Sequence, residues 1–190
     1  MYKNCLKRVI DFLLSLIGIV VLSPVLLVLA IIIKVTSPGP VLFKQERMGK
    51  DNVRFKIFKF RSMRIDTPKD VPTHMLSNPD QYITSVGKFM RKTSLDELPQ
   101  IVNIIKGDLS IIGPRPVIEE ELEKYGENKE KFLSVTPGLT GYWQANGRSS
   151  TTYEQRMEME LYYIDHISPK LDFKIFFKTI ESVIKKEGAI

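Results

Sequence analysis

The N-terminal region contains 22 consecutive residues without a charged side chain, from Phe12 to Ile33. About 20 apolar residues are enough for a helix to cross a bilayer, so a transmembrane helix is the default prediction. A cleaved signal peptide fits less well, because its apolar region is only about 7–15 residues long. The stretch therefore predicts a membrane-associated helix at the start of the chain.

Two features argue against a straight span. Ser23-Pro24 falls at its midpoint, where a proline removes a backbone hydrogen bond and bends a helix. Both flanks are basic, and the positive-inside rule then places both ends in the cytoplasm. The basic residues are Lys3, Lys7 and Arg8 before the stretch and Lys34, Lys44, Arg47 and Lys50 after it. A re-entrant helix that turns at Ser23-Pro24 satisfies both features, with the Ser23 hydroxyl supplying part of the lost bonding. A kinked span remains the alternative.

The charge balance indicates a partner that carries phosphates. The 190 residues are enough for one domain with its own core, and 28 basic against 22 acidic residues give a net charge of +6. Nucleic acid, an anionic membrane surface and a nucleotide all fit this charge. The lone Cys5 excludes an internal disulfide. His74 and His166 have no metal-ligand spacing, and we interpret both as structural or surface residues.

Two adjacent carboxylates, Asp96 and Glu97, lie where a helix is predicted to begin. Ser94 and Glu97 have the spacing of a capping box, although Pro99 would also allow Asp96 to be the N-cap. Either start places the carboxylates near the positive end of a helix dipole, which favours their ionised form. Capping alone is one interpretation. The other is that they hold a hard cation such as Mg2+ together with a substrate phosphate.

Two loops further along the chain carry candidate binding residues. Arg115 stands between two prolines in Gly113–Pro116, and this restricts the guanidinium to few poses, as phosphate recognition requires. An ordinary tight turn is the alternative. In the glycine-rich stretch 136–148, Gln144 and Asn146 suit a nucleobase or sugar, and Arg148 suits a phosphate.

The remaining pattern predicts an α+β fold that is mostly helical. Val41–Phe43 and Phe55–Phe60 read as a small β-hairpin that turns at Gly49–Asn52, and Arg64–Asn78 as a mobile loop. Lys59 and Arg61 share one face there, either near a ligand or as a solvated basic edge. The predicted helices are Pro79–Lys92, Val117–Leu133, Tyr153–Ile164 and Leu171–Lys185. The last is amphipathic, which suits either core packing or the membrane interface.

Ordered sequence blocks through the chain resemble one family. They are Ser23-Pro24, Gly39-Pro40-Val41, Phe55–Met63, Ser94–Gln100, Lys106-Gly107-Asp108, Gly113–Pro116, Pro137–Gly141, Asn146-Gly147-Arg148, Tyr162-Tyr163 and Leu171–Lys174. With these blocks the whole chain resembles the small monotopic phosphoglycosyl transferases, the bacterial sugar transferase family. The additional N-terminal membrane domain of larger relatives is missing, so the chain resembles the catalytic unit by itself.

The resemblance implies a reaction and a location. A sugar 1-phosphate would pass from a UDP-sugar to undecaprenyl phosphate with release of UMP, as the first membrane step of a surface glycan such as an exopolysaccharide. Residues 1–36 would form a re-entrant membrane helix, broken at Ser23-Pro24. Residues 37–190 would form a catalytic domain with amphipathic interfacial helices, at the cytoplasmic face of the bacterial plasma membrane. We then expect no nucleic-acid partner.

The resemblance also assigns roles to residues. Asp96 would be the nucleophile of a covalent step and a ligand of Mg2+, with Glu97 as its catalytic partner. Arg115 and Arg148 are then candidates for phosphate contacts.

Further candidates are Lys59 and Arg61 for phosphates, Gln144 and Asn146 for the nucleotide or sugar, and Lys7 and Arg8 for lipid headgroups. A non-catalytic membrane-anchored module and a glycosyltransferase that releases UDP are the competing hypotheses. The sequence leaves open the sugar, the glycan pathway and whether the chain forms a homo-oligomer.

Overall fold

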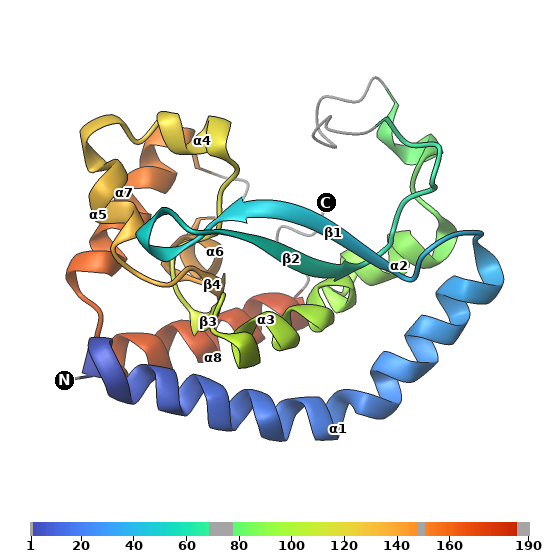
Figure 1. Ribbon diagram of the computed structural model, residues 1–190, viewed down its shortest axis with the longest axis horizontal. Helices are drawn as coiled ribbons and strands as arrows, with labels where there is room; N and C mark the ends of the chain where they lie inside the picture. Colours follow the sequence, from blue (N-terminus) through green and yellow to red (C-terminus); the bar gives the residue numbers. More distant parts are fainter. Residues whose placement is uncertain (1, 69–77, 148–150, 186–190) are drawn as a thin grey trace.

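The computed structural model describes residues 2–68, 78–147 and 151–185. One long helix, α1 (Lys7–Thr36), runs along one side of the molecule, and the other elements gather over it (Figure 1). They are short helices and two small two-stranded sheets. The prediction of a mostly helical α+β fold is confirmed.

Helix α1 is bent but continuous. It follows a short π-helix, Tyr2–Leu6, and contains Pro24, and its axis curves strongly in Figure 1. Pro24 cannot donate to the carbonyl of Val20, four residues earlier. The Ser23 hydroxyl donates to that carbonyl instead, at 2.8 Å. The predicted break at Ser23-Pro24 is therefore a bend within one helix, because a neighbouring side chain replaces the missing bond.

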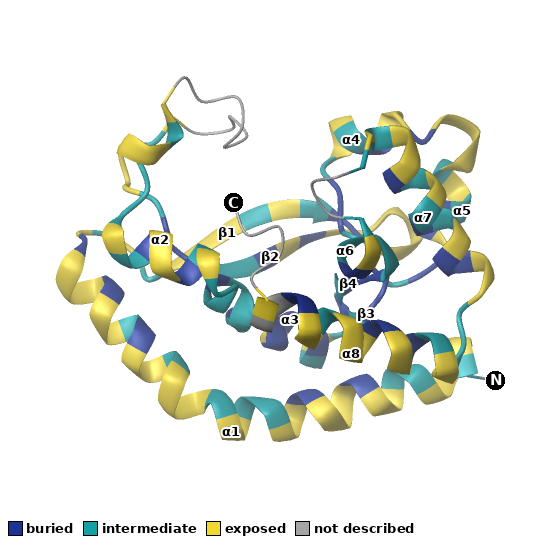
Figure 2. Cartoon of the chain, turned by 180° about the vertical axis from the view of Figure 1, so that it is seen from behind, coloured by how far each residue is buried: buried dark blue, intermediate teal, exposed yellow. Residues whose placement is uncertain are grey.

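The middle of α1 is exposed, whereas both of its ends pack against the rest of the chain (Figure 2). Asp11 and Ser15 are buried toward one end, and Leu29 and Ile33 toward the other. Leu29 and Ile33 share a core cluster with Phe60 and Met90. The helix is long and apolar enough to cross a membrane. These features indicate that the protein associates with membranes.

Charged groups attach the first turns of α1 to helix α3 (Ile101–Lys106). The Arg8 guanidinium donates to the carbonyls of Ile104 and Ile105 at 2.5 and 2.8 Å. These carbonyls belong to the last turn of α3, whose carbonyls lack partners inside the helix, although the Gly107 N–H also donates to that of Ile104, at 3.1 Å. Arg8, predicted to lie near lipid headgroups, is therefore a C-terminal cap of α3 in this structure.

Asp172 forms a second attachment of the N-terminal segment. Its carboxylate accepts hydrogen bonds from the hydroxyls of Tyr2 and Tyr163, at 2.6 and 2.8 Å, and forms an ion pair with the Lys7 ammonium at 2.5 Å. The Lys7 and Asp172 side chains are only 12% and 8% exposed. Lys7 was also predicted to lie near headgroups, and here its charge is paired inside the protein.

The predicted β-hairpin is confirmed. Strand β1 (Leu42–Met48) pairs antiparallel with β2 (Arg54–Phe60) across a 3-10 turn at Lys50–Asn52. β1 extends beyond the predicted Val41–Phe43. The register places Phe43 opposite Lys59 and Arg47 opposite Phe55. Because side chains alternate along a strand, Arg47 and Lys59 point to the same face of the hairpin.

A second sheet carries the loop Gly113–Pro116, which contains Arg115 and is called the arginine loop below. Strand β3 (Ser110–Ile112) pairs in parallel with β4 (Gly138–Thr140), which leads into α6 (Tyr142–Asn146). Gly113 and Gly138 allow the two loops to touch, because a Cβ on Gly138 would lie 2.1 Å from the Gly113 nitrogen. The chain between β3 and Val117 is therefore fixed against β4.

Two predicted helices are wrong in extent. The segment 79–92 forms a 3-10 turn, Pro79–Gln81, and then α2 (Ser85–Lys92), because the intervening backbone pairs with residues 62–64. The segment 117–133 divides into α4 (Glu119–Glu123) and α5 (Lys129–Leu133). Between them Gly126 has a φ of 51°, which no continuous helix allows. The segment 69–77 of the predicted mobile loop lies outside the described residues.

The two C-terminal helices are confirmed as α7 (Tyr153–Asp165) and α8 (Pro169–Lys185). Helix α8 buries Ile175 in the main core, which also contains Tyr163 and Leu122. Its outer side exposes large apolar side chains. These are Phe173, Phe176, Phe177 and Ile180.

We predict that Asp172→Asn lowers the free energy of unfolding by about 3 kcal/mol, because it leaves the buried Lys7 ammonium without its counter-charge. Urea unfolding in detergent micelles measures the change. Asp165→Asn is the matched control, since its ion pair with Lys131 is exposed and should contribute at most about 1 kcal/mol. Equal losses in both variants would contradict the buried attachment.

Candidate active site

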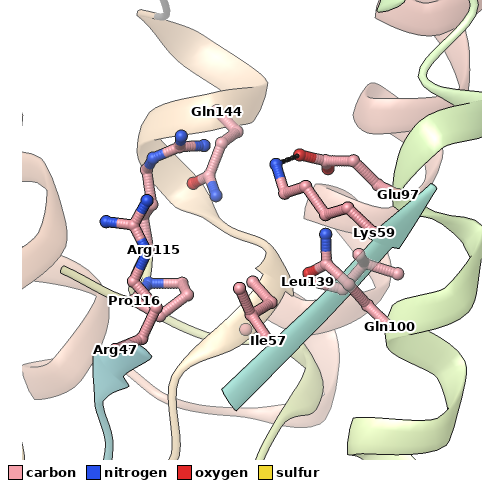
Figure 3. A pocket seen from close by; sticks show the side chains of 10 residues that line it. Arg47, Ile57, Lys59, Glu97, Gln100, Arg115, Pro116, Leu139 and Gln144 are labelled. Carbon is pink, nitrogen blue, oxygen red and sulfur yellow. Dashed lines mark hydrogen bonds and ion pairs between the residues drawn. The ribbon is translucent and has the colours of Figure 1, made fainter. Parts of the chain in front are cut away.

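A pocket lies between the arginine loop and the face of the hairpin that carries Arg47, Ile57 and Lys59 (Figure 3). This face is called the inner face of the hairpin. Lys59 and Glu97 lie on one side of it, Arg47 and Arg115 lie on the other, and Ile57 lies between them. The full lining is Arg47, Ile57, Lys59, Glu97, Gln100, Arg115, Pro116, Gly138, Leu139 and Gln144. The pocket thus separates an acidic side from a side that carries two guanidinium groups.

The acidic side is built on a 3-10 turn, Leu95–Gln100, which continues into α3. Asp96 and Glu97 lie in its first turn, as predicted. The predicted capping box is wrong: Ser94 has a φ of 55° and its side chain makes no capping bond. An N-cap residue needs an extended backbone, which this left-handed conformation does not provide. Asp96 is not the N-cap either, since it lies inside the turn.

The carboxyl group of Asp96 is buried next to the pocket, with the residue 9% exposed. Burial, and to a lesser extent the charge of Glu97, raises the pKa of Asp96 to about 6, while Lys59 and Arg91 oppose the shift. Asp96 is therefore mostly ionised at neutral pH, yet burial leaves its carboxylate poorly hydrated. A poorly solvated carboxylate of this kind is a suitable nucleophile.

Lys59 and Glu97 form an ion pair across the acidic side, at 2.5 Å between Nζ and Oε1. Lys59 reaches it from β2, and both side chains remain partly exposed. The sequence predicted both residues for the site, and the structure brings them together. Lys59 therefore places a positive charge beside the two adjacent carboxylates.

A buried carboxylate, that of Glu160, anchors the backbone of the arginine loop. The backbone N–H of Arg115 donates to its Oε1 atom at 3.0 Å. Glu160 is fully buried, and burial raises its pKa to about 7, although the bond from Arg115 and the charge of Arg156 counteract this. The guanidinium of Arg115 also lies over the Trp143 ring, 5.9 Å from its centroid. These contacts hold Arg115 at the pocket as the two flanking prolines predicted.

Three further residues of this region were not predicted. Arg47 and Gln100 line the pocket, and Arg91 lies close enough to lower the pKa of Asp96. Arg47 had been counted among the charges that flank the membrane segment. The hairpin register identifies it, because Arg47 and Lys59 point to the same face once the strands are paired.

Two predicted binding residues lie elsewhere. Arg61 is buried and donates to the carbonyls of Ser37 and Pro38, so it fixes the chain just after α1. Asn146 bonds to the Tyr142 carbonyl and to the Lys178 ammonium. Neither residue lines the pocket. Arg148 lies outside the described residues.

The carboxylates fit a hard cation only if a substrate completes its coordination. Within residues 2–68, 78–147 and 151–185, no group of three or more His, Cys, Asp or Glu side chains could hold a metal. Glu97 lines the pocket, and the buried Asp96 precedes it in the same turn without itself lining the pocket. Mg2+ typically uses one or two carboxylates plus substrate phosphate oxygens, so this donor set fits Mg2+.

Comparison with known proteins places the chain in a family. The model of the family described as bacterial sugar transferase matches residues 2–186. The chain belongs to the bacterial sugar transferase family. The matched range includes α1, the acidic turn and the arginine loop.

Curated relatives of this bacterial sugar transferase differ in length. A UDP-glucose:undecaprenyl-phosphate glucose-1-phosphate transferase of Escherichia coli (strain K12) is 42% identical over 94% of this chain and 40% of its own. An undecaprenyl-phosphate galactose phosphotransferase of Salmonella typhimurium is 36% identical over 97% and 41%. The exopolysaccharide production protein ExoY of Sinorhizobium fredii is 37% identical over 96% and 87%. The chain thus spans less than half of the first two relatives.

We predict that Lys59→Met raises the pKa of Asp96 above about 6 in this bacterial sugar transferase. The variant removes a positive charge that favours the ionised carboxylate of Asp96 and that is paired with the neighbouring Glu97. NMR titration of 13C-labelled aspartate measures the shift. Lys56→Met, on the opposite face of β2, is the control and should leave the pKa unchanged; an unchanged value in Lys59→Met would refute the coupling.

Proposed function

We propose that the protein transfers a sugar 1-phosphate from a UDP-sugar to undecaprenyl phosphate and releases UMP. The observation that carries this proposal is the pocket in which the Asp96–Glu97 turn faces a fixed arginine loop. The names of the relatives from Escherichia coli and Salmonella typhimurium support the same substrate classes. The reaction would be the first membrane step of a surface glycan.

The reaction proceeds in two steps. The Asp96 carboxylate attacks the β-phosphorus of the UDP-sugar, and the bond from that phosphorus to the bridging oxygen breaks, so UMP leaves with the electron pair. A phosphate oxygen of undecaprenyl phosphate then attacks the phosphosugar on Asp96. The P–O bond to Asp96 breaks, and the free carboxylate returns. Covalent catalysis of this kind allows the soluble and the lipid substrate to react in turn.

The other residues supply charge and orientation. Arg115 and Lys59 offset the negative charge of the phosphates, where most of the catalytic work in phosphoryl transfer lies. Glu97 orients Lys59 through their ion pair. Asp96 would hold Mg2+, which supplies further positive charge to the phosphates when bound. Gln144 lines the pocket and would contact the nucleotide or sugar. The phosphate role of Arg148 rests on the sequence pattern alone, because this residue lies outside the described residues.

The attachments of α1 support a re-entrant membrane helix. Lys7 near its start is paired with Asp172, and the chain just after its end is held by Arg61. Both ends thus belong to one catalytic domain. A straight helix of 30 residues would separate them by about 45 Å and carry one end across the bilayer. The bend at Pro24 lets the exposed apolar middle enter one leaflet and return.

The exposed side of α8 would lie at the membrane interface. Phenylalanines project from it, and its lysines suit the headgroups of anionic lipids. The pocket would then lie at the cytoplasmic face of the bacterial plasma membrane, where both the nucleotide sugar and the lipid phosphate are accessible.

Nucleotide release tests the reaction. We predict that the protein in nanodiscs with Mg2+ and undecaprenyl phosphate releases UMP from one or two members of a UDP-sugar panel. Asp96→Asn should lower the rate at least about 1000-fold, because the nucleophile is lost. UMP and UDP are assayed separately. Release of UDP would instead identify a glycosyltransferase, and nucleotide binding without any release would identify a binding module.

Cysteine labelling tests the topology. A membrane-impermeant maleimide should label the natural Cys5, and separately a Val35→Cys, Cys5→Ser variant, in inverted vesicles but not in intact spheroplasts. The expectation follows because both ends of a re-entrant helix lie on the same side. Labelling of one site in spheroplasts would establish a spanning helix.

A further inference from the structure

Two guanidinium groups from distant parts of the chain meet on one side of the pocket. Arg47 belongs to β1 and Arg115 to the loop after β3, and both line the pocket (Figure 3). The backbone N–H of Met48 donates to the carbonyl of Val117 at 2.8 Å. This bond ties the end of β1 to the arginine loop and so keeps the two arginines together.

The two charges repel one another in a partly desolvated place. Burial, and after it the nearby charge of Arg115, lowers the pKa of Arg47 to about 10. Glu121 and Glu97 partly offset this effect, while Arg156 adds to it. In the part of the chain that the structure describes, neither Arg47 nor Arg115 forms an ion pair. A bound anion would remove the repulsion.

We propose that Arg47 and Arg115 together bind the phosphate of the departing nucleotide, with Arg47 as a binding residue that the reaction requires. This inference rests on the proposed function. In phosphoryl transfer the attacking and leaving oxygens lie roughly in line on opposite sides of the phosphorus. Asp96 precedes Glu97 in the turn that forms the acidic side, and Glu97 lines the pocket there. With attack from that side, the leaving phosphate points to the opposite side, where Arg47 and Arg115 lie.

Both guanidinium groups are held ready for this role. Arg47 donates from Nη2 to the side-chain oxygen of Gln45 at 2.7 Å, which limits its rotation. Arg115 is held through its backbone by Glu160. Planar guanidinium groups match phosphate oxygens in a bidentate geometry, which a lysine cannot reproduce. Arg47 also donates several bonds as phosphate charge develops on the leaving UMP, which stabilises the first step.

Direct binding of UMP tests the proposal without turnover. Calorimetry of the 190-residue chain in nanodiscs compares UMP with uridine for the wild type, Arg47→Gln, Arg47→Lys and Arg54→Gln. Arg54 is the matched control, because it lies on the outer face of the same hairpin in exposed ion pairs. We expect Arg47→Gln to weaken UMP binding by about 10- to 100-fold, the value of a charge-assisted hydrogen bond. Arg47→Lys should weaken UMP binding less than Arg47→Gln does, and the affinity for uridine should be unchanged in both variants.

The possible outcomes distinguish a failure of the Arg47–Arg115 phosphate subsite from a failure of the proposed function. A selective loss of UMP affinity in Arg47→Gln, with Arg54→Gln like the wild type, supports the subsite. Equal UMP affinity in Arg47→Gln and Arg54→Gln, in a protein that releases UMP, overturns the subsite and leaves the proposed function intact. A parallel loss of uridine binding in both Arg47 variants overturns it too, because the role would then be structural. A wild type that neither releases nor binds UMP overturns both.

Discussion

The carboxylate of Asp11 connects the membrane helix to the strand that carries the arginine loop. It is buried, and it accepts bonds from the Ser110 hydroxyl at 2.6 Å and the Ile111 N–H at 3.1 Å. A buried carboxylate is tolerated only with such donors around it. Because β3 leads directly into Gly113–Pro116, the position of α1 sets the position of Arg115. The candidate pocket and α1 are therefore linked directly through β3.

The same helix also positions the acidic side of the pocket. A Cβ on Gly18 would lie only 2.9 Å from the Ile101 side chain, so α1 and α3 approach closely at that point. Ile101 is the first residue of α3 and follows the Asp96–Glu97 turn without a break. Arg8 fixes the other end of α3. The contacts along the first half of α1 thus reach the elements that carry both sides of the pocket.

Local patterns in the sequence predicted what depends on local chemistry. The hairpin, the C-terminal helices, the position of Asp96 and Glu97 and the rigid Arg115 loop follow from turn residues, periodicity and prolines. Contacts between segments far apart in the sequence determine the features that local patterns did not predict. Ser94 adopts a left-handed backbone that its spacing to Glu97 does not reveal, and Lys7 and Arg8 find partners more than 90 residues away. Arg47 became recognisable only through the strand register, since its charge alone resembles a membrane flank.

Burial and ion pairing have opposing effects on Asp96, and their balance suits a nucleophile. Removal of water makes a carboxylate reactive but favours its protonated form, and the adjacent Glu97 adds to that tendency. The Lys59–Glu97 ion pair neutralises part of this neighbouring charge. The pKa of Asp96 then remains at about 6, so the ionised form predominates at neutral pH. Complete burial without Lys59 would protonate Asp96, whereas full exposure would solvate it. The hairpin therefore contributes to both sides of the pocket, because Lys59 favours the ionised form of Asp96 and Arg47 lines the opposite side.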